Sequence, residues 1–83
     1  SDADWLKYHR ELFGMTQSNV VSFLEVVTGE NVNPGRIAEI ETGKRAIKPL
    51  WRRKLEGLFA CLRQPSSRAK DWREYLYAIW RNL

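Results

Sequence analysis

The segment from Asn33 to Arg45 constrains the fold of this chain more than any other stretch of the sequence. Asn33 is a favoured helix N-cap, and Pro34 suits the first helical position because no hydrogen bond from an N–H group is needed there. At the other end, Gly43 suits a left-handed C-cap, and the two cations after it interact favourably with the negative end of the helix dipole. The segment therefore predicts a short helix of about two and a half turns over residues 34–42.

This predicted helix has one apolar side and one polar side. At about 100° per residue, Ile37, Ile40 and Glu41 fall on the same side. The opposite side and its flanks hold Gly35, Arg36, Glu39 and Thr42. The two isoleucines can anchor the helix to a core. A short anchored helix with a polar outer side and basic residues past its end has the properties needed to read the major groove of DNA.

Hydrophobic periodicity predicts four further helices, and no alternating strand pattern is present. The expected helices cover residues 2–13, 16–28, 34–42, 49–62 and 67–82. We therefore expect an all-α fold: a compact five-helix domain over residues 1–83, with its core over about 4–63. The helix at about 67–82 is expected to add a packing or dimerisation surface.

The composition favours one globular domain. Hydrophobic residues make up 43% of the 83 residues, which argues against disorder, and the length suits a single core. A net charge of +4 permits a nucleic-acid partner without requiring one. Cys61 is the only cysteine, which favours a reducing, cytoplasmic setting. No apolar run approaches the roughly 20 residues of a membrane span, so no membrane association is expected.

The inventory of reactive side chains argues against an enzyme. The chain has one histidine, His9, and one cysteine, Cys61, and no serine or threonine is spaced with them as in a catalytic triad. No cluster has metal-ligand spacing, and there is no glycine-rich phosphate loop. We therefore expect no catalytic residues, no metal, no cofactor and no small-molecule ligand.

A set of residues at the first turn and in the second and third predicted helices forms a pattern. Its members are Arg10, Gly14-Met15-Thr16-Gln17, Val21, Leu24 and Arg36-Ile37-Ala38-Glu39-Ile40-Glu41-Thr42-Gly43-Lys44-Arg45. The pattern resembles the lambda-repressor-like (Xre/Cro-type) family of helix-turn-helix DNA-binding proteins over about residues 8–62. The resemblance implies that the second and third helices form the helix-turn-helix.

Two features depart from the family's pattern. The connection from Leu24 to Asn33 is longer than the usual tight turn, so either the second helix is extended or the turn is a loop. Pro34 and Gly35 occupy the first recognition positions, where relatives often place polar base-reading residues.

Arg10 and Glu41 are charged residues at or beside the apolar sides of their predicted helices. A lone buried charge costs several kcal/mol, so each needs a partner. The resemblance implies that the two form a structural ion pair. The alternative is a pair of unrelated, solvated surface charges.

The candidate base-contacting residues are Asn33, Gly35, Arg36 and Glu39. Arginine can donate two hydrogen bonds to guanine, and glutamate can accept one from cytosine. Gly35 would permit close approach to the DNA. Alternatively, Arg36 and Glu39 form a surface pair that contributes about 0.3 kcal/mol and reads no sequence.

The candidate phosphate contacts are Thr16, Gln17, Lys44, Arg45 and Lys48. Thr16 and Gln17 begin a helix whose N–H groups and dipole favour an anion, and the resemblance implies that Gln17 clamps the DNA backbone. The three cations follow the third helix and can neutralise phosphates. The alternatives are simple capping by Thr16 and a solvated basic loop. Arg52 and Arg53 either extend this patch or lie on a separate surface of the fourth helix.

The last helix is rich in aromatic residues. Its predicted dimer-interface residues are Trp72, Tyr75, Leu76, Ile79, Trp80 and Leu83. We expect part of this strip to pack on the first helix near Trp5 and the remainder to form a two-fold contact. The alternative is that the whole strip is intramolecular core.

These features together predict a sequence-specific regulator of transcription that binds double-stranded DNA. We expect a homodimeric repressor of phage, plasmid or bacterial origin that binds a palindromic operator through the helix 34–42 and associates with the nucleoid when bound. The alternative is an antitoxin or protein-interaction adaptor, whose aromatic C-terminal helix binds a partner protein such as a toxin or another regulator.

Overall fold

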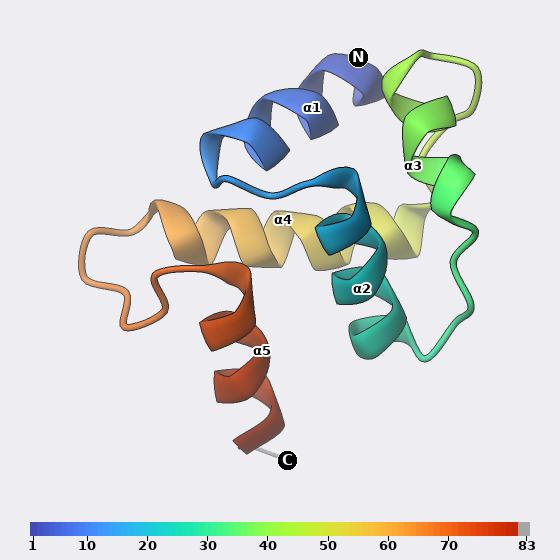
Figure 1. Cartoon of the computed structure of the whole chain (residues 1–83). Helices are drawn as coiled ribbons and strands as arrows, with labels where there is room; N and C mark the ends of the chain where they lie inside the picture. Colours follow the sequence, from blue (N-terminus) through green and yellow to red (C-terminus); the bar gives the residue numbers. More distant parts are fainter. Residues whose placement is uncertain (82–83) are drawn as a thin grey trace.

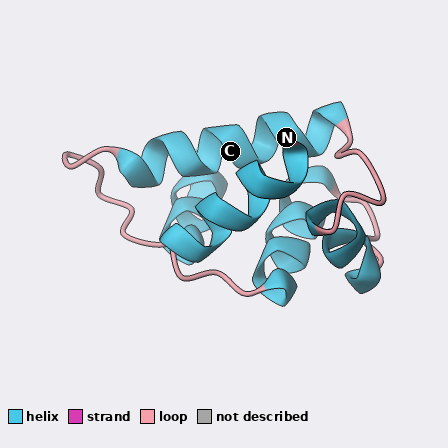
Figure 2. Cartoon of the chain, turned by 90° about the horizontal axis from the view of Figure 1, so that it is seen from above, coloured by secondary structure: helices cyan, strands magenta, loops and turns pink. Residues whose placement is uncertain are grey.

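The computed structural model describes residues 1–81, and over that range the chain is helical with loops between the helices (Figure 1). The helices are α1 (Asp2–Leu12), α2 (Gln17–Thr28), α3 (Pro34–Glu41), α4 (Pro49–Arg63) and α5 (Trp72–Arg81). Figure 2 shows helices and loops but no strand in the described part of the chain. The prediction of an all-α fold with five helices is therefore confirmed. No helix within residues 1–81 is long and apolar enough to cross a membrane.

The helix ends form where the sequence places capping residues. Thr16 Oγ1 accepts a hydrogen bond from the Asn19 N–H, and Asn19 Oδ1 accepts one from the Thr16 N–H, both at 3.0 Å. This reciprocal capping box begins α2. Gly29 ends α2 with a φ of 72°, a left-handed conformation that glycine adopts without a steric penalty. Asn33 caps α3 by accepting the Gly35 N–H at 2.9 Å.

The core lies around α4, which crosses the middle of the molecule with α1 and α3 on one side of it and α5 on the other (Figure 1). The largest fully buried side chains all belong to α1–α4: Phe23, Phe59, Leu6, Leu24, Ile37, Ile40, Leu55, Leu58 and Val20. Burying each of the larger apolar side chains contributes about 1.5–3 kcal/mol. Val32 and Ile47 add to this core from the loops before and after α3.

The last helix begins later than predicted, at Trp72 and not near residue 67. Ser67 Oγ accepts the Ala69 N–H at 3.2 Å, which holds this stretch in a non-helical turn. Asp71 then caps α5, since its Oδ1 accepts the Glu74 N–H at 2.9 Å. Residues 64–71 are therefore a loop.

The expected packing of the last helix near Trp5 is wrong. α5 packs on α2 and α4, where the rings of Tyr75 and Phe23 lie 6.1 Å apart. Trp5 packs within the other half of the molecule, with its ring centroid 5.5 Å from that of Phe59 and 3.7 Å from the Arg52 guanidinium.

Candidate nucleic-acid interface

Arg10 and Glu41 form the predicted ion pair, which joins α1 to the end of α3. Arg10 Nε donates to Glu41 Oε2 at 2.8 Å, and Arg10 Nη2 donates to Glu41 Oε1 at 2.9 Å. The two side chains are only 13% and 5% exposed. A third hydrogen bond runs from Arg10 Nη1 to the Met15 carbonyl oxygen at 2.9 Å. This two-pronged geometry fixes the orientation of α3 against α1.

Burial and hydrogen bonding act in opposite directions on the Glu41 carboxyl group. Burial is the largest single influence and raises its pKa. The hydrogen bonds from Arg10 and Gln17, together with the positive charges of Arg10 and Lys7, outweigh burial and hold the pKa of Glu41 below its usual value. The hydrogen bond to Glu41 is the main cause that raises the pKa of Arg10. The pair is therefore ionised at neutral pH.

Gln17 contacts the same carboxylate. Its Nε2 donates to Glu41 Oε1 at 3.0 Å, so the side chain predicted to clamp DNA ties the start of α2 to the end of α3. The backbone N–H groups of Gln17 and Ser18 have no acceptor among residues 1–81 and remain available to an anion at the positive end of the helix dipole. The side chain of Thr16 caps α2, which is the alternative to a phosphate contact that the sequence offered for this residue.

The sequence left two explanations open for the long connection between α2 and α3: an extended second helix or a loop. The structure shows both features, since α2 extends to Thr28 and residues 29–33 form a loop. This loop is attached to the helices on either side. Trp51 Nε1 on α4 donates to Glu30 Oε1 at 2.9 Å, and Glu25 Oε2 on α2 accepts the Val32 N–H at 3.1 Å. Val32 is 4% exposed. The start of α3 is thus positioned by buried contacts, although the loop is long.

The sequence analysis did not identify Glu25, Glu30 or Trp51 as residues that position α3. One signal was available. A tryptophan on a core-facing helix strip usually needs a hydrogen-bond acceptor for its indole N–H, but the sequence does not show which acidic residue supplies it.

α3 has the two-sided character that the sequence predicted. Ile37 and Ile40 are 0% and 1% exposed, while Asn33 and Gly35 lie at the surface. Arg36 is half-buried, and no acidic side chain within residues 1–81 lies at ion-pair distance from it. The guanidinium of Arg36 is therefore available to an external partner.

Gly35 has open space around it. A Cβ atom at this position would have only Asn33 Oδ1 nearby, at an ordinary contact distance of 3.4 Å. The φ of Gly35 does not lie in the left-handed region either. The chain's own packing therefore does not require glycine here, and the bare backbone is available for close approach by another molecule.

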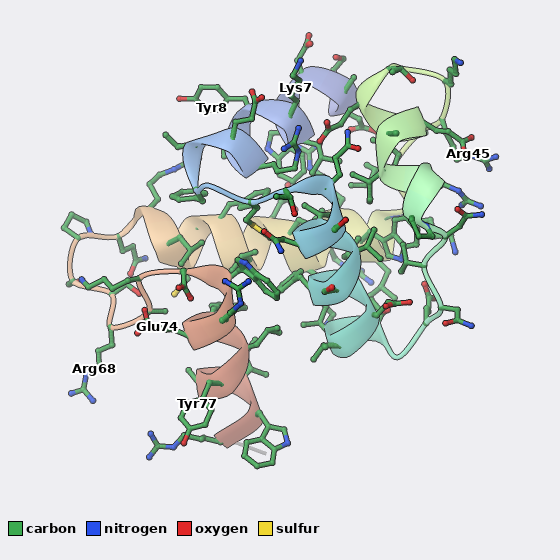
Figure 3. The ribbon with its side chains drawn as sticks, in the orientation of Figure 1. Lys7, Tyr8, Arg45, Arg68, Glu74 and Tyr77 are labelled. Atoms are coloured by element: carbon green, nitrogen blue, oxygen red, sulfur yellow. The ribbon has the colours of Figure 1, made fainter. Side chains whose placement is uncertain are left out.

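Glu39 pairs with Arg45 and not with Arg36. Arg45 Nε lies 3.2 Å from Glu39 Oε2, and the two side chains are 48% and 41% exposed. Figure 3 shows Arg45 at the outer edge of the molecule beside α3. An exposed pair of this kind contributes only about 0–1 kcal/mol, so a stronger partner can separate the two side chains.

The remaining cations of the predicted patch differ in their availability. Lys44 is exposed and has no acidic partner within residues 1–81. Lys48 Nζ lies 3.8 Å from Glu30 Oε1 and 5.0 Å from the centroid of the Trp51 ring, so it stabilises the loop before α3. Arg52 is paired with Asp2 and Glu56, and it therefore does not extend the patch.

The residues predicted for a dimer interface divide into two groups. Trp72 is 9% exposed and belongs to the core, and Tyr75 and Leu76 pack against that core. Trp72 is thus covered by its own chain, whereas Tyr75 and Leu76 are half-buried, and the dimer interface stays a prediction. Ile79 and Trp80 are 37% and 70% exposed and remain accessible. Leu83 lies outside the described residues.

The single histidine and the single cysteine make structural contacts. His9 Nδ1 lies 2.8 Å from the Trp5 carbonyl oxygen, and its Nε2 contacts Arg63 at 2.5 Å. Cys61 Sγ lies 3.2 Å from Ser67 Oγ. Among residues 1–81, no three His, Cys, Asp or Glu side chains lie close enough together to hold a metal ion.

The surface around α3 thus combines an exposed helix tip, an arginine without an acidic partner among residues 1–81, an exposed ion pair and an exposed lysine past the helix end. No protein-family model matches this chain, and no curated protein and no solved structure is significantly similar to it.

Proposed function

We propose that this protein binds double-stranded DNA sequence-specifically and regulates transcription. In this proposal α2 and α3 form a helix-turn-helix of the lambda-repressor-like kind, and α3 enters the major groove. The observation that carries the proposal is the arrangement of α3. Two fully buried isoleucines anchor the helix, while Arg36 on its flank and Lys44 beyond its end have no acidic partner among residues 1–81.

The dimensions of α3 suit the major groove. An α-helix with its side chains is about 10–12 Å across, which fits the roughly 12 Å width of the major groove of B-DNA. Asn33 and Gly35 at the exposed tip can approach base edges. Arg36 can donate two hydrogen bonds to guanine O6 and N7. Glu41, held by Arg10 and Gln17, keeps the far end of the helix against the core.

Separation of the exposed Glu39–Arg45 pair would supply two DNA contacts at once, one to a phosphate and one to a base. When Arg45 turns to a DNA phosphate, its pairing with Glu39 is lost at a cost of about 0–1 kcal/mol. Glu39 is then available to accept a hydrogen bond from cytosine N4. Lys44 and the unoccupied N–H groups at the start of α2 supply further phosphate contacts.

Regulation in this proposal occurs by occupancy of an operator. Two copies on a roughly palindromic site would place their α3 helices about 34 Å apart in successive major grooves and exclude polymerase. An inverted repeat among the preferred DNA sequences would therefore indicate that the protein binds as the homodimer that the sequence predicts.

We expect Arg36→Ala to relax the preference for a guanine at one position of each half-site. The loss corresponds to about 1–3 kcal/mol at that base pair, because a two-hydrogen-bond contact to guanine O6 and N7 is removed. The measurement is selection of bound duplexes from a random DNA pool with wild type and variant in parallel, after circular dichroism has shown equal helicity.

Lys44→Ala is the matched control for this experiment. It should weaken binding to all duplexes alike and reduce the slope of log K against log salt concentration by about 0.9, without changing the preferred sequence. The proposal fails if the wild type enriches no sequence, or if Arg36→Ala and Lys44→Ala change affinity and preference in the same way.

A further inference from the structure

A groove of about 480 Å³ runs between the second half of α2, the middle of α4 and α5. Its walls include Phe23, Val27 and Leu76, which are buried or half-buried. Val26 and Trp80 also line it, and their side chains are 67% and 70% exposed. The groove therefore has an apolar interior and two large apolar side chains at its mouth that this chain leaves uncovered.

Gly57 lies in the wall that α4 contributes, and its lack of a side chain shapes the groove. A Cβ atom there would lie 3.2 Å from Tyr75 Oη on α5, which is a tight contact. Glycine inside a helix costs about 1 kcal/mol relative to alanine. The glycine thus allows α5 to approach α4 closely and leaves a bare backbone surface at the groove.

The charged residues at this groove have one sign. Arg53 and Lys54 of α4 line it and are exposed, and no acidic residue of the described chain lines it. A partner that buries its own apolar side chains here would gain electrostatically from flanking carboxylates. An apolar interior with a basic rim along the α4 wall matches a helix whose apolar stripe is bordered by acidic residues on that side.

A second copy of this chain fits the groove less well. α5, the helix that such a copy would present, carries Arg73 and Arg81 against a single Glu74. Its net positive charge would meet the basic rim formed by Arg53 and Lys54, and like charges brought together in this way disfavour association.

We propose that the groove between α2, α4 and α5 binds an amphipathic helix of a partner protein, with an apolar stripe at positions i, i+3 or i+4 and i+7 and with acidic residues beside that stripe, on the side that faces Arg53 and Lys54. α5 and α3 lie on opposite sides of α4 (Figure 1), so this site goes beyond the proposed DNA contact and leaves α3 accessible. The bound partner would cover Val26 and Trp80.

The test uses a displayed library of helical peptides in which apolar, acidic and basic residues are randomised. The library is selected on the wild-type protein and counter-selected on Val26→Asp. We expect enriched peptides to carry the apolar stripe with acidic flanks, and to bind Val26→Asp and Trp80→Ala about tenfold more weakly than wild type. Both replaced side chains are exposed, so neither substitution removes core packing.

Charge reversal provides the second arm. Arg53→Glu with Lys54→Glu should weaken the enriched peptides by about tenfold and shift a repeated selection towards basic flanks. The matched control is Arg68→Glu with Lys70→Glu, which changes the net charge equally. Both side chains are exposed and neither lines the groove, and Figure 3 shows Arg68 pointing outward from the molecule. This control should leave peptide affinity within about twofold.

The proposal is overturned if no peptide binds the wild type more tightly than Val26→Asp, or if the enriched peptides lack acidic flanks. It is also overturned if the charge-reversal pair and its control lose peptide affinity equally. A concentration-dependent dimer in sedimentation that Val26→Asp dissociates would also overturn it, because a second copy would then occupy the groove. Selection of DNA duplexes by Val26→Asp is expected to match the wild type, so failure here is distinguishable from failure of the DNA proposal.

Discussion

Glu41→Ala is expected to lower the free energy of unfolding by about 3–5 kcal/mol, because it leaves the Arg10 guanidinium buried without a counter-charge. The Arg10 side chain is 13% exposed, so water replaces the lost carboxylate only in part. The same substitution removes the acceptor for Gln17 Nε2. A domain of this size is stabilised by roughly 4–12 kcal/mol in total, so the substitution should remove at least about a quarter of the stability and, at the lower end of that range, unfold the domain.

The measurement is urea unfolding followed by tryptophan fluorescence and circular dichroism. Arg10→Met with Glu41→Leu is the control, since replacing both partners by apolar side chains removes the uncompensated charge. This double variant should be more stable than Glu41→Ala alone. Wild-type stability in Glu41→Ala would show that the pair does not hold α1 against α3.

The ion pair also predicts how stability depends on pH. Since the folded-state pKa of Glu41 is lowered, its contribution is fully present above the unfolded-state value of about 4.3 and is lost as the pH falls through the lower folded value. Glu41→Gln has no such titration. The difference in free energy of unfolding between wild type and Glu41→Gln should therefore shrink on going from pH 7 to pH 3. An unchanged difference across that range would contradict the pKa direction.

Trp51→Ala is expected to cost about 3–5 kcal/mol, because the indole is 2% exposed and its removal leaves a large cavity beside the loop before α3. The variant also loses the hydrogen bond from Trp51 Nε1 to Glu30 and the ring that faces Lys48. We therefore expect the loop at residues 29–33 to exchange its amide hydrogens faster, in addition to a lower urea midpoint.

Trp51→Phe separates these two effects. Phenylalanine retains much of the buried volume but has no N–H donor, so the hydrogen-bond loss alone should cost about 1 kcal/mol beyond the change in packing. Glu30→Gln keeps an acceptor for the indole N–H, so it should lower the free energy of unfolding less than either Trp51→Ala or Trp51→Phe. Equal amide exchange at Val32 in wild type and Trp51→Ala would contradict the proposed role of Trp51 in holding the loop.

Local signals in the sequence were sufficient for the first four helices of the chain. Ser1, Thr16, Asn33 and Pro49 lie at or next to the observed helix starts, and Gly29 and Gly43 adopt left-handed conformations at helix ends. These features depend on residues within one turn of each other, so the order of residues is enough to predict them. The inward side of α3 follows from its period for the same reason.

The last helix shows where local signals failed. The apolar period runs through Ala69, which is buried, but Ser67 and Asp71 form turn and cap hydrogen bonds that delay the helix to Trp72. The competing turn and helix differ by only a few local hydrogen bonds, and the hydrophobic pattern does not distinguish between them.

The candidate site was predicted in part. The surface positions of Asn33, Gly35 and Lys44 follow from the helical period and the turn after it. The Glu39–Arg45 pair was not predicted. The helical period makes Arg36, three residues before Glu39, the expected partner of Glu39, but the chain after Gly43 folds back and brings Arg45 closer.

By itself the sequence determined the fold class, the ends of most helices and the side of α3 that is buried, since all of these depend on neighbouring residues. Only the tertiary structure decided that Gln17 donates to Glu41, that Glu30 accepts from Trp51, and that Trp80 is exposed while Trp72 is buried. These contacts join residues far apart in the chain, and they depend on how the helices cross, which no local periodicity specifies.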